Sequence, residues 1–206
     1  GEVMPVDAKF IRTRVAEDLR ARLGERWFDS GSPKLTIASA NNDTDFSIEL
    51  DCYTDRRYGE YECTISVVLK WKKFAKLFRE LDKWYSVKFQ GMVRPGNKIF
   101  ARVNFDRIHG SPRRDLFWVA NEQDVDAFTA RCVDDLDGKV GDWIRSWFTW
   151  PSALNVMDAD SDLCGAWRDT AYTCLLEQLH GREAAHNWIL GTVAKIWLAW
   201  LGVSDI

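Results

Sequence analysis

The chain has 206 residues, 46% of them hydrophobic and 29% charged, with a formal net charge of −3 at pH 7. This length and apolar content suit a single domain over residues 1–206 that buries a large core. No run of eighteen apolar residues occurs, so we expect neither a membrane-spanning helix nor a membrane partner.

The cysteines are odd in number and include no CxxC pair (Cys52, Cys63, Cys132, Cys164, Cys174). This pattern fits reduced thiols in a core better than it fits a disulfide framework or a zinc site. We therefore expect a cytoplasmic protein that carries no metal and no cofactor.

The chain begins with a predicted helix over residues 8–23, because apolar residues recur there at helical spacing and Gly24 follows as a stop signal. A first strand is expected from Leu35 to Ser39, where apolar and polar residues alternate.

Two longer alternating segments, residues 46–53 and 61–69, predict a pair of half-buried strands. A four-residue loop at 56–59 would place Cys52 opposite Cys63 and all apolar side chains on one face, which fixes the register. We expect these two cysteines to be buried free thiols. A disulfide is the alternative in an oxidising compartment.

Residues 71–85 change to helical period, with an aromatic stripe on one side and basic residues on the other. A strand over 98–106, a loop over 109–114 and a short strand around 116–119 are expected to follow.

A long helix is predicted from the cap Asn121, with Asp124 at the capping-box position, to Trp147. Gly138 and Gly141 weaken this helix, so we expect it to bend there.

Trp150-Pro151 is expected to end the long helix. Asp160 or Ser161 is then expected to cap a helix that extends to about His180, and a last helix follows Gly181.

These elements predict an α+β fold: an N-terminal helix, an antiparallel β-meander with a packed basic helix, and a C-terminal helical part rich in Trp. Residues 1–120 are expected to hold mainly the sheet and two helices, and residues 121–206 the helical part.

Charge is segregated along the chain. Residues 70–114 hold thirteen Lys or Arg against three Asp or Glu, a net of +10, and residues 115–169 hold twelve acidic residues against four basic ones, a net of −8. These blocks can face each other within the chain, face a second subunit in a dimer, or face solvent. The sequence leaves the three arrangements open.

The basic block contains a candidate patch for phosphate backbones, which gives nucleic-acid binding as an alternative function. Its residues are Lys72, Lys76, Arg79, Lys83, Arg102, Arg113 and Arg114. The other interpretation is a solvated helix face. The aromatic residues of the same helix fall on its apolar stripe, which favours the core over base stacking.

The acidic block contains two candidate partner-binding groups: Asp134, Asp135 and Asp137, and then Asp158, Asp160 and Asp162. The second spacing resembles the start of an EF-hand loop, but Leu163 stands where that loop needs Gly, and Asp169 stands where it needs Glu. Helix capping with solvation, or an acidic partner surface, explains both groups better than a metal site does.

No residue is assigned a catalytic role. The histidines stand in no metal-ligand spacing, and no nucleophile elbow, phosphate loop or dinucleotide fingerprint occurs. An enzyme whose site forms only in the folded chain is a further alternative.

Residues 59–69 (GEYECTISVVL) and 116–126 (LFWVANEQDVD), which lead into a long acidic helix, resemble small bacterial α+β proteins of the polymorphic-toxin immunity type. The resemblance covers residues 8–150 in order of elements and implies no catalytic residue. It implies a soluble protein that neutralises a toxin by occlusion. The acidic groups would then face a nuclease-like toxin, because such toxins present basic clefts.

Overall fold

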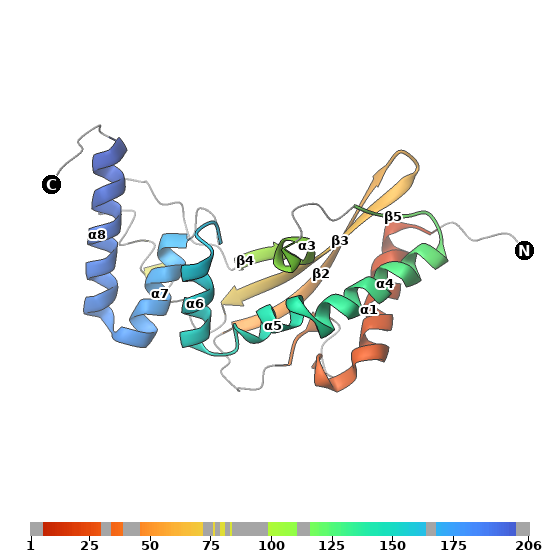
Figure 1. The fold of residues 1–206 in the computed structure, drawn as a ribbon, viewed down its shortest axis with the longest axis horizontal. Helices are drawn as coiled ribbons and strands as arrows, with labels where there is room; N and C mark the ends of the chain where they lie inside the picture. Colours follow the sequence, from red (N-terminus) through yellow and green to blue (C-terminus); the bar gives the residue numbers. More distant parts are fainter. Residues whose placement is uncertain are drawn as a thin grey trace, which may run out of the picture. The chain divides into compact units, whose positions relative to one another are not determined.

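The computed structural model describes residues 6–29, 34–38, 46–71, 76, 79–80, 83, 99–110, 116–163 and 168–200. Contacts divide the chain into two compact units. The first comprises residues 1–70 and 101–148, and the second comprises residues 71–100 and 149–206. The fold is α+β, as predicted, and Figure 1 labels its elements.

The first unit is built on a sheet in the order β1-β2-β3-β4, with β5 also paired to β3. β1 is antiparallel to β2, and β5 is antiparallel to β3. The strands are β1 (Leu35–Thr36), β2 (Phe46–Arg57), β3 (Glu60–Trp71), β4 (Ile99–Asn104) and β5 (Phe117–Val119).

The β2–β3 hairpin has a shorter turn than predicted. Only Tyr58 and Gly59 separate the strands, and their φ angles are 52° and 84°. Positive φ at both central residues is the signature of a type I′ turn. A two-residue turn moves the expected pairing by two residues, so Cys52 does not lie opposite Cys63. The apolar faces are preserved, because side chains alternate with a period of two.

Two helices cover the inner face of this sheet. α1 (Ala8–Leu23) packs against β2, α4 (Glu122–Asp137) packs against β5, and the two helices pack against each other. Both bury an apolar stripe at helical spacing: Ile11, Val15, Leu19 and Leu23 of α1, and Val125, Phe128, Cys132 and Leu136 of α4. A short 3₁₀ helix, η1 (Gly24–Arg26), follows α1.

The start of α4 confirms the predicted cap. The Asn121 side chain accepts a hydrogen bond from the Asp124 N–H at 3.0 Å. The Asp124 carboxylate accepts one in return from the Ala120 N–H at 2.8 Å, one residue before the expected donor. Both backbone donors at this helix start therefore have acceptors.

The strand predicted over 98–106 ends earlier, at Asn104. The Asn104 side chain accepts the Arg107 N–H at 2.8 Å and so starts helix α3 (Phe105–His109), which buries Phe105 and ends at Gly110 with φ 78°. His109 is therefore helical rather than part of the predicted loop. Residues 111–114 of that loop lie outside the described residues.

The predicted bend is a complete break. α4 ends at Asp137, Gly138 interrupts it, and α5 (Lys139–Arg145) follows, so the helix also ends two residues before Trp147. Gly141 is required by packing, because a Cβ there would collide with the Leu136 carbonyl oxygen.

The second unit contains a helix that the sequence interpretation missed. Thr149 caps α6 (Trp150–Ala159) by accepting the Ser152 N–H, and Pro151 lies in its first turn. Trp150-Pro151 therefore begins a helix instead of ending one, since proline at the first helical positions removes only an N–H that has no partner there.

α6 packs against α7 (Arg168–His180), and α7 packs against α8 (Arg182–Trp200). Asp160 is the C-terminal cap of α6 rather than the start of the next helix, which begins at Arg168. Gly181 separates the last two helices, as predicted. Among the helices described, none is long and apolar enough to cross a membrane.

The predicted helix over 71–85 is described only in part. Trp71 is the last residue of β3, so the helix does not start there. Lys76, Arg79, Glu80 and Lys83 are helical, and the remaining residues of this prediction lie outside the described residues.

Replacing Gly141 tests the close contact between α5 and the end of α4. We expect Gly141→Ala to lower the free energy of unfolding by about 1–3 kcal/mol, because the added methyl group has to displace backbone. Gly191→Ala is the matched control. Nothing lies within 4 Å of its added Cβ, so it should raise stability by about 0.5–1 kcal/mol. Urea unfolding measures both, and equal effects would contradict the packing role.

Candidate functional site

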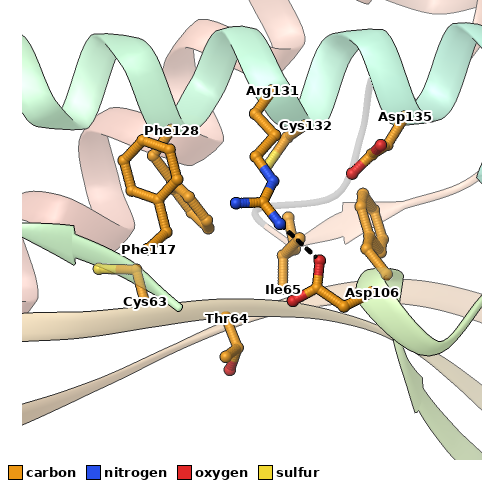
Figure 2. A pocket seen from close by; sticks show the side chains of 10 residues that line it. Cys63, Thr64, Ile65, Asp106, Phe117, Phe128, Arg131, Cys132 and Asp135 are labelled. Carbon is orange, nitrogen blue, oxygen red and sulfur yellow. Dashed lines mark hydrogen bonds and ion pairs between the residues drawn. The ribbon is translucent and has the colours of Figure 1, made fainter. Parts of the chain in front are cut away.

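A small pocket lies beneath α4, between β3, α3 and β5 (Figure 2). Its lining residues are Cys63, Thr64, Ile65, Phe105, Asp106, Phe117, Phe128, Arg131, Cys132 and Asp135. The cavity has a volume of about 10 Å³, which is room for about one water molecule. Small-molecule sites commonly occupy about 300–1,000 Å³, so this pocket does not hold a substrate.

An ion pair crosses this pocket. Arg131 of α4 donates to Asp106 of α3 at 2.8 Å, and Figure 2 shows its side chain extending from the helix toward that carboxylate. The Arg131 guanidinium also lies 5.6 Å from the ring centre of Phe117, which packs against Phe128 at 5.2 Å. Arg131 and Asp106 are minority charges of their respective blocks, and together they connect α3 to α4.

Two thiols of the hairpin, Cys63 at the pocket and Cys52 on β2, have strongly raised pKa values. Burial is the main cause that raises the pKa of Cys63 to about 12, with a contribution from Glu62. Burial likewise raises the pKa of Cys52 to about 12, with contributions from Cys63 and Asp51. With a pKa near 12, both thiols are protonated at neutral pH. They are therefore poor nucleophiles, because the thiolate is the reactive form. The prediction of buried free thiols at these positions is confirmed.

The first acidic group does not form one surface. Asp134 and Asp137 are exposed, but Asp135 is only 6% exposed and lines the pocket. Successive helical residues are rotated by about 100°, which turns Asp135 toward the buried side.

Two further acidic residues of α4, Glu122 and Asp126, are exposed and lie on the same side as Asp134 and Asp137. These four residues, here named the α4 acidic face, span an arc of about 120° at helical periodicity. Two weak ion pairs reach them: Arg14 to Asp126 at 3.9 Å, and Arg26 to Asp137 at 3.6 Å.

The second acidic group lies at the C-terminal end of α6 in the second unit. Asp158 accepts the Tyr172 hydroxyl at 2.6 Å, and the Asp160 side chain accepts the Asp162 N–H at 3.1 Å. The pKa of Tyr172 rises to about 12 through burial and this hydrogen bond. Arg168 donates to the Met157 and Asp160 carbonyls, both at 2.7 Å, which satisfies carbonyls at the helix end. Among the described residues, no three His, Cys, Asp or Glu come together as a metal site.

The residues of the candidate basic patch belong to different units of the chain. Arg102 belongs to the first unit, where it pairs with Asp51 of β2 at 2.9 Å. Lys76, Arg79 and Lys83 are exposed in the second unit and share one side of a helix at helical periodicity. Lys72, Arg113 and Arg114 lie outside the described residues.

The sequence interpretation missed an exposed feature at the tip of the β2–β3 hairpin. β1 reaches only Glu49 and Leu50 of β2, and β5 ends opposite Tyr61 of β3. The turn extends past β5 in Figure 1. We name residues 55–60 the hairpin tip.

Tyr58 at this tip is 99% exposed and has a φ of 52°. The left-handed region costs a residue with a side chain about 1–2 kcal/mol, and Asn, Asp or Gly usually occupies this turn position. A ring that is fully exposed gains almost no packing energy in return. The unusual Tyr-Gly pair between two alternating segments is the sequence signal that could have identified this turn.

The two arginines of the tip differ. Arg57 pairs with Asp55 at 2.9 Å and with Glu62 at 3.6 Å. Arg56 is exposed and has no ion pair with any described residue. Tyr53, five residues before Tyr58 on β2, is 56% exposed.

Comparison with known protein families, curated proteins and solved structures finds no match to this chain. The resemblance to immunity-type proteins is therefore still a prediction, and the functional argument depends on the side chains described above.

Alkylation tests the protonated state of the two hairpin thiols. At pH 8 a thiol with a pKa near 12 is ionised in only about one molecule in 10⁴. We expect iodoacetamide to leave Cys52 and Cys63 unmodified in the folded protein and to label both in urea, as read by peptide mass spectrometry. Rapid labelling of the folded protein at pH 8 would contradict this assignment.

The raised pKa of the two thiols also means that their contribution to stability is present below about pH 9 and is lost as the pH rises toward 12.

Replacing Tyr58 tests whether the fold itself needs this side chain. We expect Tyr58→Asn to raise the free energy of unfolding by about 0.5–1 kcal/mol, because Asn tolerates positive φ and the ring makes no packing contact to lose. Chemical denaturation measures the difference. A clear loss of stability would show that the ring supports the fold.

Proposed function

We propose that this protein binds another protein and masks its surface, as an immunity protein that neutralises a toxin by occlusion. The carrying observation is the hairpin tip, where a strained Tyr58 is almost fully exposed. The pocket beneath α4 holds about one water molecule and is therefore too small to be the site of this function.

The α4 acidic face supports the same function through steering. Complementary charge accelerates encounter and sets partner choice more than it sets final affinity. A partner with a basic surface therefore fits this face. Asp135 is removed from the predicted binding group, because its side chain is buried against the pocket.

Nucleic-acid binding is the second candidate, and the exposed row of Lys76, Arg79 and Lys83 favours it. It requires an affinity that falls steeply with salt, with a log–log slope of about −0.9 per phosphate contacted on duplex DNA. Protein binding steered by the α4 acidic face also depends on salt, chiefly through the association rate.

Affinity capture from native lysate, with and without nuclease, separates these functions. A stoichiometric protein that survives nuclease treatment is expected. Nucleic acid that disappears with nuclease would assign the function to the basic row instead. Recovery of neither would contradict both candidates.

Charge reversal on α4 tests the steering role. We expect Asp134→Lys to slow association with the captured protein about threefold at low salt, and Asp134→Lys with Asp137→Lys to slow it about tenfold. Dissociation should change little, because these side chains are exposed.

Glu183→Lys is the control for this test, since Glu183 is an exposed acid on α8 of the second unit. Surface plasmon resonance gives the rates. Association and affinity within a factor of two of the unmodified protein for the double variant would remove the α4 acidic face from the proposal.

A further inference from the structure

We propose that the hairpin tip is the anchor of this complex: Tyr58 enters a concave site on the protein partner, and Arg56 pairs there with a carboxylate. The inference rests on the proposed function and adds the contact residues and the chemistry of the partner site.

The geometry favours a concave partner surface. The tip is two strands wide, which is about 5 Å between strand axes, and β1 and β5 pair with neither side of it. A narrow protrusion that carries a fully exposed ring loses little by entering a cleft, because no intramolecular contact has to break. Tyr and Arg are the side chains that most often supply binding energy at interface centres.

The backbone at Tyr58 supplies an independent argument. A turn with positive φ at both central positions is best served by Asn or Gly, and a bulky ring is a poor choice for folding. Strained backbone positions cluster at active sites, ligand clamps and switch regions, where the strain serves a function. The ring therefore has a use that the free chain does not show.

The charges define the partner chemistry. Arg57 is already paired with Asp55 and Glu62, whereas Arg56 has no ion pair among the described residues, so its guanidinium is available to an external carboxylate. Residues 55–62 carry two basic and three acidic side chains, a net charge of −1. The absence of a positive excess favours a protein surface over polyphosphate chains and anionic membranes as the partner.

Two substitutions with matched controls test the anchor on the captured protein. We expect Tyr58→Asn, which keeps the turn, to weaken binding by about 30- to 100-fold through faster dissociation. Leu190→Gln, which removes another exposed apolar side chain, should leave binding within twofold. Arg56→Gln should weaken binding about tenfold, and Arg57→Gln less than threefold.

A photo-crosslinking amino acid at position 58 or 190 locates the contact. Crosslinks from position 58 alone, to a partner peptide that contains Asp or Glu, are expected. If a captured protein binds Tyr58→Asn as tightly as the unmodified chain, the anchor is wrong, and the chain binds that protein through another surface. If no protein is captured, both the anchor and the proposed function are contradicted. Tyr58-dependent binding to duplex DNA or to phosphatidylserine vesicles would overturn the choice of a protein partner.

Discussion

The first unit depends on one constraint, the period-two alternation of β2 and β3. It directs Ile48, Leu50, Ile65 and Val67 to the face that α1 and α4 cover, where all four are buried. Polar residues of the same strands then face away, and some form ion pairs across the sheet, such as Lys70 with Glu49 at 2.7 Å. Register and helix packing follow from this pattern, since a slip of one residue would exchange the two faces.

The same strands continue past the elements that pair with them. β2 and β3 each have twelve residues, whereas β1 has two and β5 has three. Among the described residues, the hairpin beyond Tyr61 has the Arg57 ion pairs, and neither β1 nor β5 pairs with this part of it. A segment of this kind adds little to the core, and its exposed side chains are free to serve recognition. The surface that we propose for binding is therefore a consequence of strand length.

Local signals predicted the fold well, and tertiary contacts limited the prediction of the site. Alternation and the Asn121 cap act within a few residues, so the sequence states them directly. Pro151 was misread because proline both ends one helix and begins the next, and only the Thr149 cap distinguishes the two cases. The Arg131–Asp106 pair joins residues 25 apart, and no local pattern predicts it. Asp135, in contrast, could have been placed in the core from helical periodicity alone.

The charge blocks of the sequence are not the charges that a partner meets. Arg102 is engaged by Asp51, an acid outside both blocks, so part of the basic excess is neutralised within the first unit. In that unit, the proposal rests on two exposed charged features, the α4 acidic face and Arg56. A partner complementary to both would present a basic surface around a cleft that contains a carboxylate. Nucleic-acid-cleaving enzymes combine these features, because basic side chains bind the phosphate backbone and carboxylates hold the catalytic metal ions. Under the function proposed above, a nuclease is the class of toxin that fits this surface.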